Sequence, residues 1–334
     1  MSDTSAPIPS LADRVRQTEA GSPVVGVHFF GDTPVFVLGE EHLLLAPEQG
    51  EQRIAVHAGA ILASSSDGAR VVTGGDDGKL VATGADGKPE ILATDAKKRW
   101  IDQVALGPDG TVAWSAGKTA QVLTKKGEWR SFDAPSTVAG LCFAPKGLRL
   151  AIAHYNGATL WFPNAEGAKP QTFEWKGSHL AVTISPDGRF LMTAMQESTL
   201  HGWRIVDGKN MRMSGYSARV RSLSWSADGN FLATSGSEHL ILWPFDGKEG
   251  PMGKQPTMLA PSKARVSVVA CHPHQPVMAA GYSDGAVLLV RLEDGALIGV
   301  RDADQQPASA LGWNAKGSKL AFGTEAGDAG VLLL

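Results

Sequence analysis

The cluster Cys271-His272-Pro273-His274 has the clearest potential for chemistry in the sequence. Thiolate and imidazole suit a structural zinc ion, but such a site needs four ligands, usually supplied as two pairs. No second Cys/His pair lies nearby in the sequence. In the repeat that the chain carries, Cys271 takes a core position and His272-Pro273 replaces a Ser-Pro turn. A structural role is therefore favoured, and the sequence predicts no metal and no cofactor.

Paired acids such as Asp76-Asp77 could bind calcium or act as an acid and a base. They lie in a recurring Asp-Gly turn, where Asp side chains bond their own backbone, so the turn interpretation is favoured. The sequence has no Gly-x-Ser-x-Gly, no His-Glu-x-x-His and no phosphate-binding glycine loop. His179 takes a position that is apolar in most repeats, which favours a core histidine. We therefore predict that the protein is not an enzyme.

The elements that would position these side chains are short strands separated by glycine turns. Residues 71–83 are typical of a β-hairpin, because an Asp-Gly turn tolerates left-handed backbone dihedrals. The chain carries about eight such hairpins, each preceded by a turn resembling Ser-Pro-Asp-Gly. Six of these turn glycines recur every 37 to 42 residues, at Gly31, Gly68, Gly110, Gly147, Gly188 and Gly229. No window shows the 3.6-residue periodicity of a helix.

Each repeat therefore predicts one four-stranded antiparallel sheet of about 40 residues. A single sheet of this size cannot bury both of its faces. Radial stacking would cover each face with a neighbouring sheet, and closing the ring would remove the exposed ends. The pattern thus indicates a β-propeller.

The repeats resemble those of the WD40 family. Ile184-Ser185-Pro186-Asp187-Gly188 and Gly75-Asp76-Asp77-Gly78 match the family's turns, and the resemblance covers residues 22–334. The family's tryptophan position is filled in three repeats, by Trp161, Trp203 and Trp243.

The sequence also departs from the family pattern. No Trp-Asp dipeptide occurs, and the family's Gly-His is replaced, for instance by Gly215-Tyr216. In the family, a His, a Ser or Thr, an Asp and a Trp form a buried hydrogen-bond network. Asp77 and Asp284 take the Asp position, but the sequence shows no complete set. We therefore expect most blades to be held by apolar packing.

The predicted fold class is an all-β, WD40-type β-propeller of eight four-stranded antiparallel blades. Seven blades are the alternative, since that number is commoner in the family. Residues 22–334 would form this single propeller. The last repeat stops at its third strand, Val331 to Leu334. We therefore expect residues 1–21 to supply the closing outer strand, with Leu11 to Thr18 as the candidate.

The loops that lead into the innermost strands of a propeller converge around one mouth of its central channel. Aligning the repeats places Trp100, Arg219 and Arg265 at one equivalent position. Arginine and aromatic side chains gathered at one rim are typical of a binding surface, although solvated loops without a partner are the alternative. The predicted partner-binding residues are Trp100, Trp175, Tyr216, Arg219, Arg221 and Arg265.

Composition bounds the function. The formal net charge is −3, which gives no support to nucleic-acid or membrane-surface binding. The sequence shows no signal peptide and no apolar run long enough to span a membrane, so we expect a cytoplasmic protein. Two cysteines, Cys142 and Cys271, are too few for a disulfide framework.

The predicted function is that of a non-catalytic scaffold, monomeric by itself, which binds a protein or peptide at the channel mouth. The alternative is a small-ligand-binding, hydrolytic or oxidoreductase propeller with a site in the central channel. That alternative would favour converging carboxylates and an export signal, and the sequence shows neither.

Overall fold

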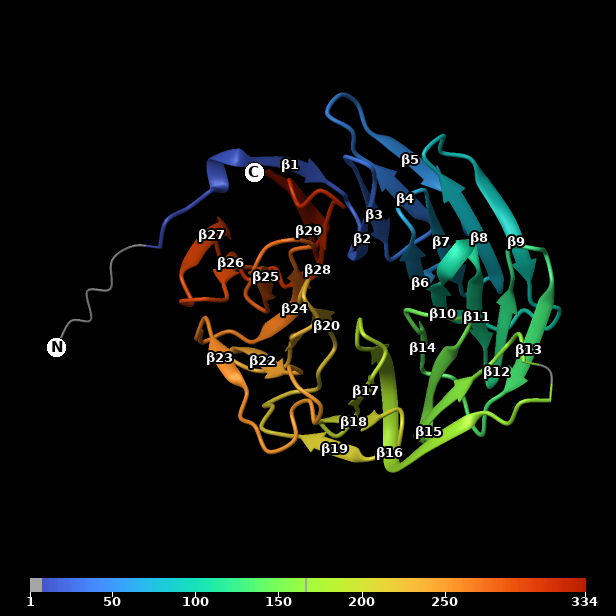
Figure 1. Ribbon diagram of the computed structural model, residues 1–334. Coiled ribbons are helices and arrows are strands. Elements are labelled where there is room, and N and C mark those ends of the chain that lie inside the picture. Colours follow the sequence, from blue (N-terminus) through green and yellow to red (C-terminus); the bar gives the residue numbers. More distant parts are fainter. Residues whose placement is uncertain (1–7, 166) are drawn as a thin grey trace.

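The computed structural model describes residues 8–165 and 167–334. Their strands form seven hydrogen-bonded sheets arranged in a ring (Figure 1). Six of these sheets have four strands and one has six, and all their pairings are antiparallel. The protein is therefore an all-β propeller, as the repeats predicted.

Three four-stranded sheets come first along the chain. They contain β2 (Val24–Phe30), β3 (Thr33–Leu38), β4 (His42–Leu45) and β5 (Gln52–Ala55); β6 (Ile61–Ser66), β7 (Arg70–Gly75), β8 (Lys79–Gly84) and β9 (Pro89–Thr94); and β10 (Ile101–Leu106), β11 (Val112–Ala116), β12 (Thr119–Leu123) and β13 (Trp129–Asp133). A short 3₁₀ turn, η2 (Pro108–Gly110), joins β10 to β11.

The six-stranded sheet follows. It contains β14 (Gly140–Phe143), β15 (Leu150–Trp161), β16 (Gln171–Ile184), β17 (Phe190–Met195), β18 (Leu200–Arg204) and β19 (Asn210–Met213). β15 pairs with β14 through its first residues and with β16 through residues 155–160. β16 then pairs with β17 through residues 179–184.

Three further four-stranded sheets complete the ring. They contain β20 (Leu223–Trp225), β21 (Phe231–Thr234), β22 (Leu240–Pro244) and β23 (Thr257–Leu259); β24 (Val266–Cys271), β25 (Val277–Tyr282), β26 (Val287–Arg291) and β27 (Leu297–Arg301); and β28 (Ala308–Trp313), β29 (Lys319–Thr324), β30 (Asp328–Leu333) and β1 (Val15–Glu19).

The prediction of eight separate four-stranded blades is not supported, because the ring contains seven sheets, the number given as the alternative. The difference arises at β15 and β16, which are 12 and 14 residues long. Tyr155 pairs with Ser178, so hydrogen bonding continues across the point where two repeats would separate. The sequence repeats count hairpins, whereas strand pairing decides where one sheet ends. Two of the repeats thus share the six-stranded sheet.

The two ends of the chain meet in the last sheet. β1 is its outer strand and pairs with β30 from Val15↔Leu332 to Glu19↔Asp328, close to the C-terminus (Figure 1). This strand begins at Val15 rather than Leu11, because Ala12–Arg14 form a 3₁₀ turn, η1. Residues 1–7 of the predicted N-terminal segment lie outside the described residues.

Packing between neighbouring sheets forms the core. All six residues of β17 are buried, since both faces of its sheet are covered. The first and last sheets share one cluster, in which Phe36 and Leu44 pack with Ala321 and Val331. This contact is the junction that closes the ring.

One sheet also carries a buried polar network. Nδ1 of His57 is hydrogen-bonded to Oδ1 of Asp77 (3.0 Å), and its Nε2 is hydrogen-bonded to the Thr73 hydroxyl (2.9 Å). Three of the family's four network positions are therefore filled here. Thr83 takes the fourth position, because it pairs with Val71 in the same way as the family tryptophan Trp203 pairs with Leu191 in another sheet. Its hydroxyl is buried and has no partner among the described residues.

We predict opposite effects from the same substitution at these two threonines. Thr83→Val should stabilise the protein by about 1 kcal/mol, because it removes an unbonded buried hydroxyl without changing the side-chain shape. Thr73→Val should destabilise it by about 1–3 kcal/mol, because the His57 ring then loses a bond. Urea unfolding of both variants checks the prediction, and equal effects would contradict it.

Candidate functional site

The innermost strands surround the ring axis (Figure 1). Contacts link β2 to β28, β28 to β24, β24 to β20, and β6 to β10. Trp100 immediately precedes β10, and Arg265 immediately precedes β24. We use the term axial face for a surface formed by two sets of residues. One set leads into these strands, and the other consists of the bulge residues described next.

A β-bulge follows the start of most innermost strands. The register shifts by one residue at Val25, Leu62, Asp102, Leu180, Ser267 and Ser309. Where the bulge residue is Ser267 or Ser309, its hydroxyl donates to the first residue of the next innermost strand, Ala308 or Val24 (2.5 and 2.6 Å). Bulges re-aim side chains, and in these two cases the serine hydroxyl reaches the neighbouring sheet.

Arg221 takes the equivalent place before β20. Its backbone N–H and that of Ser222 both donate to the Ser235 hydroxyl (3.1 and 3.0 Å). The Arg221 side chain is exposed and makes no hydrogen bond or ion pair among the described residues. By the repeat equivalence, it takes the position of Ser267 and Ser309, and β20 contacts β24, which Arg265 precedes.

Arg219 and Arg265 lie on neighbouring sheets. The N–H of Gly236 donates to the Val266 carbonyl (2.9 Å), and a Cβ at Gly236 would lie 2.9 Å from the Ala218 oxygen and 3.1 Å from the Arg219 oxygen. Arg265 is exposed, whereas Arg219 is half-buried and donates to the Gln196 side chain (2.9 Å). The structure thus brings the three predicted arginines together on the axial face.

An acidic group accompanies these arginines. The pKa of Glu238 is lowered, first by a backbone hydrogen bond and by the Ser217 hydroxyl, and to a smaller extent by the charge of Arg265. Its carboxylate is held by Ser217 (2.9 Å) and forms no ion pair with an arginine among the described residues. The positive charge of this part of the face is therefore only partly compensated.

Tyr216 does not belong to the axial face, and its prediction as a binding residue is corrected. The side chain is only 9% exposed. Its hydroxyl accepts from Trp243 Nε1 (2.7 Å) and lies 2.8 Å from the Thr234 hydroxyl. Burial raises its pKa to about 12. Tyr216 thus replaces the family histidine in a second buried network, which the sequence analysis missed because it sought a histidine.

We predict that Tyr216→Phe destabilises the protein by about 1–3 kcal/mol, because the buried Trp243 N–H loses its acceptor. Urea unfolding measures this loss. Partner binding should be unchanged once the variant is fully folded. A variant with wild-type stability and weakened binding would show instead that Tyr216 contacts the partner.

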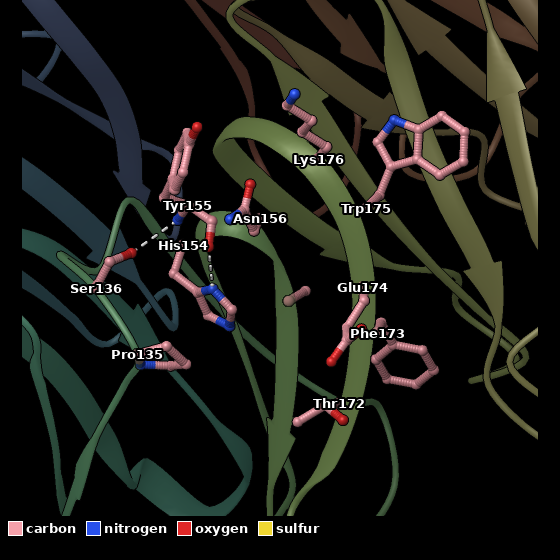
Figure 2. Close-up of a pocket in the computed structure, with 11 residues that line it drawn as sticks. Pro135, Ser136, His154, Tyr155, Asn156, Thr172, Phe173, Glu174, Trp175 and Lys176 are labelled. Carbon is pink, nitrogen blue, oxygen red and sulfur yellow. Dashed lines mark hydrogen bonds between the residues drawn. The ribbon is translucent and has the colours of Figure 1, made fainter.

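Trp175 lies apart from the arginines, on β16. With residues of β15 and the loop at Pro135 and Ser136, it lines a cavity of about 740 Å³ (Figure 2). Trp175 points away from Tyr155 and Asn156 in this view, and its ring stacks on His201 at 4.0 Å between ring centres. Trp100 and the three arginines do not line the cavity. The predicted set is therefore divided between the axial face, this cavity and the core.

The imidazole ring of His201, on which Trp175 stacks, lies in an unusual environment. His201 is fully buried, and neither of its ring nitrogens has a hydrogen-bond partner among the described residues. Burial, and then the nearby His179, lower the pKa of His201 to about 3. Its imidazole is therefore neutral in the folded protein near neutral pH.

This burial predicts a loss of stability in mild acid. The unfolded chain takes up a proton at His201 below about pH 6.5, while the folded chain does not until about pH 3. Stability should therefore fall as the pH drops below about 6.5, by about 1–2 kcal/mol at pH 5 from this residue. Urea unfolding should show a smaller fall for His201→Phe than for the wild type. An equal fall in both would contradict the assignment.

The remaining reactive groups do not assemble a catalytic site. His28 Nε2 lies 2.9 Å from the Ser64 hydroxyl, but no third group among the described residues orients the ring. Burial raises the pKa of Cys271 to about 12, so this free thiol stays protonated. His272 bonds the Gly317 carbonyl (3.0 Å) rather than a metal ligand set. In the described part of the chain, no three His, Cys, Asp or Glu side chains are grouped to hold a metal ion.

Comparison with known proteins agrees with the fold. The family model described as "WD domain, G-beta repeat" matches residues 209–243. A computationally designed protein, Ika8, superposes with a TM-score of 0.77 over 95% of this chain and 98% of its own, at 17% identity. At that identity the likeness shows the fold alone.

Three curated relatives match parts of the chain. A Protein LST8 homolog of Drosophila melanogaster is 28% identical over 35% of this chain and 41% of its own. Autophagy-related protein 16 of Arabidopsis thaliana is 27% identical over 42% of this chain and 28% of its own. Meiotic recombination protein rec14 of Schizosaccharomyces pombe is 28% identical over 32% and 36%. The chain thus spans between 28% and 41% of the length of each relative.

The fold and the matched repeat define a β-propeller of the WD40 type. The matched repeat and the three partial relatives support the resemblance to the WD40 family. Within the described residues, no helix has the length and apolar character needed to cross a bilayer.

Proposed function

We propose that the protein is a non-catalytic scaffold that binds a protein or peptide on its axial face. The observation that carries this proposal is the exposure of Trp100, Arg221 and Arg265, which lead into the innermost strands of three sheets. All three side chains are exposed, and none forms an ion pair among the described residues. Exposed arginine and tryptophan side chains are the types that most often anchor protein interfaces.

The closed ring supports this role physically. Each axial residue is attached to a strand whose sheet is packed on both sides, so its backbone is already ordered before a partner arrives. Binding then costs little conformational entropy beyond that of the side chains. WD40-repeat relatives generally act as protein-interaction scaffolds, and not as enzymes. A cytoplasmic location and a monomeric state are part of the proposal.

The cavity beside β15 favours one second candidate, a site for a small ligand. Glu174 and Lys176 line it, and neither makes an ion pair among the described residues. Binding there would be independent of the arginines. An enzymatic role has no comparable support, since no nucleophile, base and orienting group come together in the described structure.

We predict that Arg219→Ala and Arg265→Ala each weaken binding of a partner recovered by pull-down. Truncating an anchor residue typically costs about 1–4 kcal/mol of binding free energy, whereas exposed side chains contribute little to folding. Affinity measured for the recovered partner should therefore fall about fivefold or more, while the melting temperature changes by no more than about 2 °C.

The matched controls are Lys88→Ala and Lys209→Ala, which remove a positive charge at exposed sites of the outer strands and turns. Neither should change binding. If the two lysine variants bind weakly and the arginine variants bind normally, the partner uses the outer edge of the ring. Loss of binding in a Glu174→Gln variant alone would instead favour the cavity beside β15.

A further inference from the structure

The axial face has two chemically different sides. We infer that its partner is a peptide segment that carries carboxylates and a large apolar side chain, each bound to its own side. This inference rests on the proposed function and specifies the partner's chemistry. We call the two sides the apolar arc (Val25, Leu62 and Trp100) and the basic arc (Arg219, Arg221 and Arg265).

The apolar arc is formed by three successive sheets. Val25 is 51% exposed, Leu62 37% and Trp100 63%, although most large apolar side chains of the described chain are buried. Leu62 is the bulge residue of β6, which contacts β10. It takes the position of Ser267 and Ser309, whose hydroxyls reach the first residue of the next innermost strand. Leu62 and Trp100 are thus exposed apolar side chains on two sheets in contact, which a partner could cover.

The basic arc is formed by two neighbouring sheets. Arg221 precedes β20, which contacts β24, and Arg265 precedes β24. Arg219 lies beside the same junction through Gly236. Ion pairs hold many arginines of this protein, such as Arg99 with Asp95 (2.7 Å) and Arg204 with Glu249 (2.6 Å). The arginines of the basic arc have no such pair among the described residues. The guanidinium groups of Arg221 and Arg265 are therefore available to carboxylates, while that of Arg219 already donates to Gln196.

The acids of the axial face bear on the orientation of the partner: Glu238, held by Ser217, partly compensates the basic arc, whereas Asp102 lies on the Trp100 side, where no arginine of the basic arc lies. Asp102 is the acidic side chain among the bulge residues, and it follows Trp100 in β10. Burial raises its pKa, and the Ser115 hydroxyl donates to it (3.4 Å). A carboxylate of the partner is attracted by the basic arc and repelled by Asp102. The apolar side chain would therefore lie on the Trp100 side and the acids on the Arg221 side.

The two arcs supply different parts of the binding free energy. Charge complementarity speeds and orients the encounter and weakens as salt screens it. Burial of Trp100 and Leu62 slows dissociation and does not depend on screening. Loss of either arc alone should therefore weaken the same complex, but with different dependence on salt.

The test is a display selection of short random peptides on the full-length protein. We expect the enriched peptides to combine Asp or Glu with Leu, Phe or Trp. Against such a peptide, R221E/R265E should lower the affinity at least about tenfold and remove most of its salt dependence. L62S/W100A should lower the affinity about as much and leave the salt dependence unchanged. Fluorescence anisotropy measures both.

Matched controls separate these effects from general changes in charge or surface. K88E/K146E makes the same charge change at exposed lysines away from the axial face, and I91S removes an exposed apolar side chain from the outer strand β9. Both should bind the peptide as the wild type does. Melting temperatures of all variants check that they are folded.

The outcomes distinguish the two proposals. Peptides that lose affinity in the arc variants but lack acids or an apolar residue would overturn the inferred chemistry and keep the proposed function. A loss of affinity in only one of the two arc variants would likewise overturn the inferred chemistry and keep the proposed function. Peptides that bind every arc variant as tightly as the wild type, or no enrichment at all, would overturn the axial face as a docking site, and the inference with it.

Discussion

The structure depends on burying both faces of every sheet against its neighbours in a closed ring. No sheet of this chain is large enough to bury its apolar residues alone, as the six buried residues of β17 illustrate. The requirement is met at the last junction by chain ends that lie far apart in the sequence. β1 completes the sheet of β30, and Phe36 packs with Val331 across the junction. Burial of the apolar side chains therefore depends on closure of the ring.

Polar networks add to this packing in selected sheets only. His57, Thr73 and Asp77 form one network, and Tyr216, Thr234 and Trp243 form another. Each satisfies buried polar groups that would otherwise be costly. In the sheet of β17, Thr193 bonds the buried His179 (2.7 Å), whereas the Thr83 hydroxyl remains unbonded among the described residues. The fold therefore tolerates loss of the family's network wherever packing is dense enough.

Closure also creates the functional surface. Leu62 is the bulge residue of β6 and Arg221 precedes β20, while Trp100 and Arg265 precede other innermost strands. Residues from several sheets thereby form one face on a rigid frame. A scaffold needs such a preordered surface, because ordering flexible loops on binding would reduce affinity.

The sequence by itself determined the propeller class, because turn glycines and apolar strands repeat locally and need no distant contact to be recognised. It also placed Trp100, Arg219 and Arg265 at equivalent positions, since equal repeats lead to equal places in the ring. The tertiary structure decided the number of sheets, because pairing of Tyr155 with Ser178 is a contact between repeats. It also decided that Tyr216 is buried and that Val25 and Leu62 are exposed, because burial depends on what the neighbouring sheet brings against each side chain.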